Sequence, residues 1–182
     1  EHVRGAIVFE DGDLKINGLI GEHGETRVEI NGYSRGTGPT WESDVRITSD
    51  RAVIDSDVYK ALNTAQQRVW FMFSPSGTTK LDFHYQSSEG KEKLSRARLD
   101  VIDGEMMYQH FPHRFKGGTG TLIFEPDSVL IQDVNFSEGD VISKFVGQVT
   151  NIRSGEPNVI VNGTSRGLKI ESKLLADYIK PA

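Results

Sequence analysis

The sequence predicts a mostly β protein, in which an antiparallel sheet curls into a U-shaped groove or a sandwich-like shape and carries one short helix. Three observations lead to this fold. Much of the chain alternates apolar and polar residues in short runs, the period of a strand with one dry and one wet face. Turns rich in Gly and Asp-Gly separate these runs. The single helical interval is too short to cover a sheet of about ten or eleven strands, so the apolar face is expected to meet itself.

The first strands are predicted from residues 3–10 and 13–20, two apolar runs joined by Asp11-Gly12. An Asp-Gly pair supplies the positive-φ turn of a tight hairpin. Strict alternation then continues from Thr26 through Ile30, and again over residues 41–48 after a Gly-Thr-Gly-Pro loop. Four consecutive strands are therefore expected before the helix.

The helix is expected at about residues 55–70. Asp55 or Ser56 can accept hydrogen bonds from its first backbone N–H groups. An apolar stripe at helical spacing follows, formed by Val58, Leu62, Ala65 and Val69, and a break is possible near Asn63. Because apolar helix faces usually pack inward, we expect this stripe to plug an end or an edge of the sheet.

Strands resume at residues 78–86 and around Ala97 to Val101, where alternation is nearly perfect. A turn is expected at Asp103-Gly104, followed by a short strand over residues 105–108. Residues 110–118, with one Pro and two Gly, are expected to be irregular.

An internal repeat organises the whole chain. At a constant offset of 115 residues and with no gap, residues 5–32 recur as residues 120–147. Six positions are identical: Gly5, Phe9, Glu10, Ile16, Gly24 and Gly32 recur as Gly120, Phe124, Glu125, Ile131, Gly139 and Gly147. The start of the helix also recurs, since residues 170–174 resemble residues 54–58. We therefore expect a first unit at 1–117 and a truncated second unit at 118–182, forming one continuous structural domain whose terminal strands are exposed edges that could make end-to-end contacts.

Composition excludes several function classes. The net charge of −5 and the sequence pI of about 5.6 argue against nucleic-acid binding. The absence of cysteine excludes disulfides and thiolate metal sites. His110 and His113 flank Pro112 and cannot share a helical face as metal ligands do. With no nucleophile motif either, we expect no catalytic residues, no metal, no cofactor and no enzymatic activity.

The order of these pieces resembles the AsmA-like and TamB-like proteins of diderm bacteria, which belong to the repeating β-groove lipid-transfer proteins. The resemblance spans nearly the whole chain. In one unit it rests on Phe111, Pro112, Gly118, Gly120, Gly147 and residues 170–174, and in the other on Gly5, Gly32, residues 54–62, Val69, Trp70, Pro75 and Gly77. Two repeat positions depart from it, because Gly18 is replaced by Asp133 and Val28 by Ser143.

The resemblance implies a fragment of a longer periplasmic protein, anchored in the inner membrane through a segment outside this sequence. Its groove would bind lipid acyl chains, phospholipid in the first place, and serve lipid transport and outer-membrane assembly or homeostasis. The candidate lining residues are Ile7, Phe9, Val28, Ile30, Val45, Ile47, Leu81, Phe83, Tyr85, Leu99, Val101, Leu122, Phe124, Ile131, Phe145 and Val161. Alternation reports burial without saying what fills the space, so a closed β-sandwich with a structural, adhesion or glycan-binding role remains the alternative.

Overall fold

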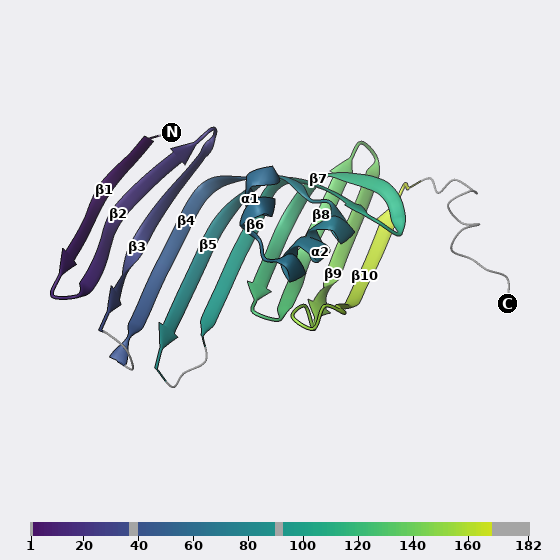
Figure 1. Ribbon diagram of the computed structural model, residues 1–182. Coiled ribbons are helices and arrows are strands. Elements are labelled where there is room, and N and C mark those ends of the chain that lie inside the picture. The colour runs from purple at the N-terminus through teal and green to yellow at the C-terminus, as the bar shows by residue number, and fades with distance from the viewer. Residues whose placement is uncertain (1, 37–39, 90–92, 169–182) are drawn as a thin grey trace.

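The computed structural model describes residues 2–36, 40–89 and 93–168, except for the Pro112 side chain, and shows one antiparallel sheet. Its ten strands follow one another in sequence order, each paired with its neighbours, as Figure 1 shows. Within the described residues the sheet does not close, since β1 and β10 pair on one side only. The strands are β1 (His2–Glu10), β2 (Asp13–His23), β3 (Thr26–Arg35), β4 (Glu42–Ile54), β5 (Ser76–Ser88), β6 (Leu94–Tyr108), β7 (Phe111–Glu125), β8 (Ser128–Glu138), β9 (Val141–Thr150) and β10 (Asn158–Arg166).

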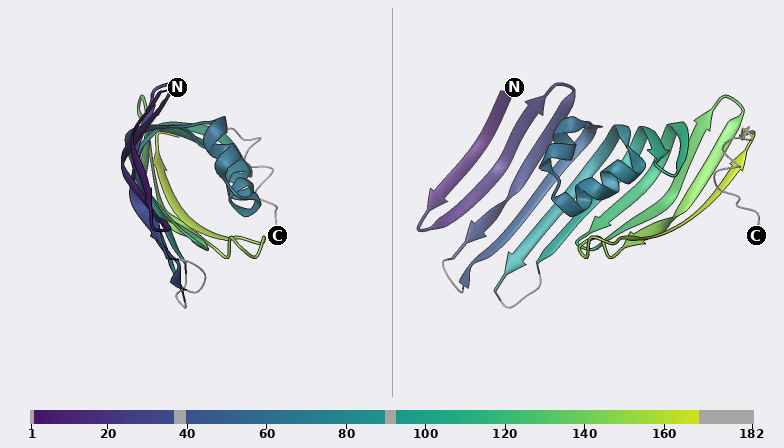
Figure 2. Two further views of the ribbon diagram at one scale, coloured as in Figure 1. Left: turned by 60° about the vertical axis from the view of Figure 1, so that its left-hand side comes forward. Right: turned by 45° about the vertical axis from the view of Figure 1, so that its right-hand side comes forward.

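The sheet is curved, and two short helices lie on its concave side (Figure 2). They are α1 (Ser56–Ala61) and α2 (Thr64–Phe73), inserted between β4 and β5. The predicted mostly β fold with a curled antiparallel sheet is confirmed, and of the two predicted shapes the described residues show an open sheet. The expectation that the apolar face must meet itself is wrong: part of this face packs against α2 instead.

The repeat reappears in the strand registers. The β1–β2 ladder shifts between Arg4 and Ala6, and the β7–β8 ladder shifts between Thr119 and Thr121, 115 residues later. The β2–β3 shift between Ile16 and Leu19 has its equivalent in β8–β9 between Ile131 and Val134. A β-bulge inserts a residue at a defined point, so matching bulges show that the two hairpins share their backbone course.

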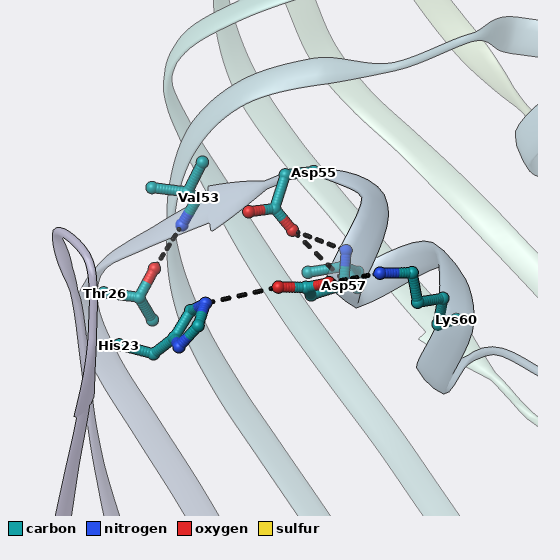
Figure 3. Close-up of polar contacts among 7 residues, drawn as sticks. His23, Thr26, Val53, Asp55, Asp57 and Lys60 are labelled. Carbon is teal, nitrogen blue, oxygen red and sulfur yellow. Dashed lines mark hydrogen bonds and ion pairs between the residues drawn. The ribbon is translucent and has the colours of Figure 1, made fainter. Parts of the chain in front are cut away.

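A break at Asn63 divides the helical interval. Asp55 caps α1 by accepting hydrogen bonds from the backbone N–H groups of Asp57 and Val58, at 2.9 and 3.3 Å (Figure 3). Asn63 begins α2 with a reciprocal capping box, in which it and Gln66 each accept from the other's backbone N–H. The helix predicted at 55–70 is therefore two helices, and the second continues to Phe73.

Two predicted irregularities are strand. β6 continues through Asp103-Gly104, where we expected a turn, although its pairing with β7 shifts on both sides of Gly104, and residues 111–118 belong to β7, where we expected irregular structure. The reason is a row of glycines across three strands, in which Gly77 pairs with Gly104 and Gly104 with Gly118. These glycines let neighbouring strands and side chains approach closely, as the Phe136 ring does over Gly118.

The buried core is small and lies in the second half of the sheet. One cluster centres on Phe115, Val134 and Phe136, and another on Val129, Val149 and Ile152. The expected restart of a helix at residues 170–174 lies outside the described residues.

Candidate functional site: the concave apolar face

All sixteen candidate lining residues lie on one face of the sheet. Directly opposed residues of an antiparallel pair project to the same side, so the registers place them row by row. Ile7, for example, is joined through Ile16 and Gly32 to Val45 and Tyr85. This is the concave face, because Phe124 packs in the same hydrophobic cluster as Val69 of α2, and α2 lies on the concave side.

One row of this face is apolar across nine strands. Consecutive strand pairs from β2 to β10 bring together Leu19, Ile30, Ile47, Phe83, Ala97, Phe124, Val129, Val149 and Val159, which we call the apolar row. At a strand spacing of about 4.8 Å, the row extends roughly 38 Å at right angles to the strands. A second row, formed by Leu81, Leu99, Leu122, Ile131, Gly147 and Val161, runs beside it from β5 to β10.

The sixteen side chains are partly open to solvent. Ile7 and Phe9 are exposed, with relative exposures of 57% and 73%, and the other fourteen are half-buried. A core packed between two walls would bury such residues almost completely. The concave face is thus an aligned apolar surface without a second sheet over it in the described residues.

Helix α2 covers one end of the apolar row. Its inward stripe, Ala65, Val69 and Phe73, packs in the cluster that contains Val129 and Val149 of the row, together with Phe124 and Val159. Phe124 therefore lies under a helix, whereas Ile30, Ile47 and Phe83 are not in that cluster. Val58, expected in the same inward stripe, is 39% exposed because it belongs to α1, beyond the break at Asn63.

Aromatic side chains fill the concave face beside the row. The Phe115 ring contacts those of Phe136 and Phe145, with centroids 5.6 and 5.1 Å apart. His113 lies against Phe111 and Phe115, with its ring centroid 4.8 Å from that of Phe115. This region is a packed aromatic cluster.

The convex face is charged. Arg46 donates to Asp82, with its Nε 2.8 Å from Oδ1, and this contact lowers the pKa of Asp82. The pKa of Asp100 is lowered by hydrogen bonds from Arg98 and Thr121. Asp44 accepts from Gln86 and contacts His84, and both contacts lower its pKa. Such cross-strand pairs keep one face of the sheet wet while the other is apolar.

A patch on the convex face of β8–β10 differs from this charged surface. Leu130, Val146 and Ile160 are partly exposed there, around a shallow hollow of about 420 Å³. Uncharged Gln148 and Asn162 contribute to its lining. The first repeat unit has polar residues at the equivalent positions.

Sequence reasoning missed about half of the apolar row. Leu19 of the row, and Val134 beside the row, follow bulges, which shift the side-chain alternation by one residue, so a strict period of two assigns them to the wrong face. Val129, Val149 and Val159 carried a usable signal, since each alternates regularly within its own strand.

Among the residues that the structure describes, no group of three or more His, Asp or Glu side chains is placed to hold a metal ion. Nor does that part of the chain contain a helix long and apolar enough to cross a bilayer.

Comparison with known proteins gives no assignment. No family model matches this chain, and no match was found among curated proteins or solved structures.

Proposed function

We propose that this chain is a hydrophobic-groove segment that binds lipid acyl chains on the concave face of its sheet. The observation that carries the proposal is the apolar row, which crosses nine strands while seven of its nine side chains stay partly exposed; Val129 and Val149 are buried. Packed protein cores do not leave such a surface open. Each methylene that an acyl chain buries there would contribute about 0.8 kcal/mol.

The two faces of the sheet support this use. An acyl chain needs a continuous apolar path, which the row provides at right angles to the strands. The convex face carries ion pairs such as Arg46–Asp82 and Arg98–Asp100, which keep the outside of the sheet hydrated. The resemblance to AsmA-like and TamB-like proteins leads us to propose the same setting for this chain: the periplasm of a diderm bacterium, within a parent protein anchored in the inner membrane and serving outer-membrane assembly or homeostasis.

The experiment is mass spectrometry of organic extracts from protein purified without detergent. The informative variant is Ile30→Ser with Ile47→Ser, because the two residues are opposed in the uncovered part of the row. Serine is tolerated on this face, where Ser34 and Ser43 are already paired. Phe124→Asp is a poorer test, since Phe124 packs in the cluster beneath α2 and a charge there would disturb folding.

A matched control changes the opposite face. Glu29→Ser with Lys80→Ser alters two exposed residues of β3 and β5 without touching the row. We expect phospholipid on the wild type and on this control, and loss of phospholipid from the Ile30/Ile47 variant while its circular dichroism stays unchanged. A lipid-free wild type that unfolds cooperatively would instead favour a structural, adhesion or glycan-binding role.

A further inference from the structure

The contacts of α2 suggest a role beyond packing, because the helix occupies the same surface that the proposed cargo would use. Of the nine residues in the apolar row, the last four, Phe124, Val129, Val149 and Val159, lie in the cluster with α2. The first five, on β2 to β6, do not. The helix therefore divides the row into a covered end and an uncovered end.

α2 is attached to the sheet by its inward face, by its C-terminal end and by one residue in its middle. Its inward face consists of Ala65, Val69 and Phe73. At the end of the helix, the Gln109 backbone N–H donates to the Met72 carbonyl at 2.8 Å, and Phe73 stacks on Tyr108. One long-range contact comes from its middle, where Arg68 Nη1 donates to the Gly155 carbonyl at 3.1 Å.

Non-helical residues flank α2, which is joined to α1 by Gln67, whose Nε2 donates to the Tyr59 and Leu62 carbonyls at 3.2 and 3.1 Å. Leu62 and Asn63 between the helices have extended backbone conformations, and Ser74 after α2 is left-handed with φ of 40°. α1 contacts the β2–β3 hairpin through an exposed pair, in which the Asp57 carboxylate lies 3.2 Å from His23 Nε2 (Figure 3). The non-helical residues before and after α2 can absorb a change in its direction relative to the sheet.

We propose that α2 is a displaceable cover, which an acyl chain longer than the uncovered end of the row replaces on Phe124, Val129, Val149 and Val159. This inference rests on the proposed lipid-binding function. From β2 to β6 the uncovered end measures roughly 19 Å, by strand spacing. A short acyl chain fits there beside the seated helix, and a long one competes with Val69 and Phe73 for the same side chains.

Two variants of the same helix test the competition. Phe73→Ser removes an inward ring, and Phe71→Ser makes the same change at a ring that is 63% exposed and packs on Tyr59 of α1, outside the cluster on the row. With a fluorescent oleoyl phospholipid as probe, we expect Phe73→Ser to bind several-fold more tightly than wild type and Phe71→Ser to bind like wild type. A helix that is merely structural gives no gain in affinity with Phe73→Ser.

A cross-link tests displacement directly, and the absence of native cysteine makes it specific. Arg68→Cys and Glu156→Cys place thiols on α2 and beside Gly155, to be joined by a short bismaleimide. We expect the cross-linked protein to bind the oleoyl probe several-fold more weakly than the unreacted double variant, and an octanoyl probe equally well. Hydrogen exchange within residues 64–73 of the wild type should accelerate on loading, and exchange within β8 and β9 should not.

The outcomes separate the two proposals. If the oleoyl probe binds with equal affinity before and after cross-linking, and exchange in α2 is unchanged, the groove binds lipid but the displaceable cover is wrong. If neither probe binds the wild type, the lipid-binding function fails and the cover fails with it.

Discussion

Gly5 and Gly120 hold the same place in the two repeat units, with φ angles of 139° and 140°. Each lies at a bulge facing the backbone of the next strand, where an added Cβ would come within 2.6 Å of the Cα of Leu19 or Val134. Residues with a side chain rarely adopt such φ angles, and the clashing backbone atoms could move apart only at a cost in stability. The repeat therefore preserves glycine at these positions for a steric reason.

Alanine at Gly120 should be strongly destabilising. We expect Gly120→Ala to cost about 3 kcal/mol or more, because strain and a backbone clash add. Gly139→Ala is the matched control, since Gly139 has φ of 60° but open space around it, and should cost about 1 kcal/mol. Urea denaturation followed by circular dichroism measures both, and equal losses would show that the clash at Gly120 is relieved.

The convex patch gives a second prediction, because the repeat supplies its own comparison. Ile160 is paired through Gln148 to Leu130, and the corresponding residues of the first unit are Asp44, Tyr33 and Lys15. The fold thus accepts charged residues at two of these positions. We expect Leu130→Lys with Ile160→Asp to change the free energy of unfolding by less than about 0.5 kcal/mol, as surface substitutions usually do.

The same double variant should bind less of a hydrophobic dye, because it removes two partly exposed apolar side chains from the patch. Val129→Lys serves as the contrast, because Val129 is buried on the concave face. This variant should lose several kcal/mol of its free energy of unfolding or fail to fold. A large loss of stability in the Leu130/Ile160 variant would show that the patch belongs to the core of the second unit.

The sequence was enough to predict the antiparallel sheet, its apolar face and the repeat, because alternation and turn glycines are local signals. It was not enough where the role of a residue depends on its partner on a second strand. Asp133 replaces Gly18 without changing the conformation, since both residues have positive φ. Ser143, in place of Val28, is fully buried, and its hydroxyl is within 2.7 Å of that of Ser165, a partner on another strand. Neither compensation can be seen in the sequence of a single strand.

Stability should fall in acid through the carboxylates of the convex face. The pKa of Asp82 is lowered by Arg46, and that of Asp100 by Arg98. Because the folded-state pKa lies below the unfolded value of about 3.9, this stabilisation is complete above that pH. It is lost as the pH falls through the folded-state pKa.

Urea midpoints measured between neutral pH and strong acid test this. Asp82→Asn with Asp100→Asn should be less stable than wild type at neutral pH and should lose less stability on acidification. The difference should shrink at high salt, because these pairs are exposed. A wild type and variant with parallel acid profiles would show that these two carboxylates are not responsible.

The capping box at Asn63 allows the stability of α2 to be measured separately from that of the sheet. Asn63→Ala leaves the Gln66 backbone N–H without its side-chain acceptor and should cost the helix about 1 kcal/mol. The sheet pairs strand to strand beneath the helix, so this loss should appear as local opening of α2. Hydrogen exchange in residues 64–73 should accelerate about fivefold while exchange in β5 and β6 is unchanged, since 1 kcal/mol corresponds to roughly that factor. Uniform acceleration across the sheet would mean that α2 and the strands unfold as one unit, and a helix bound that firmly could not serve as a displaceable cover.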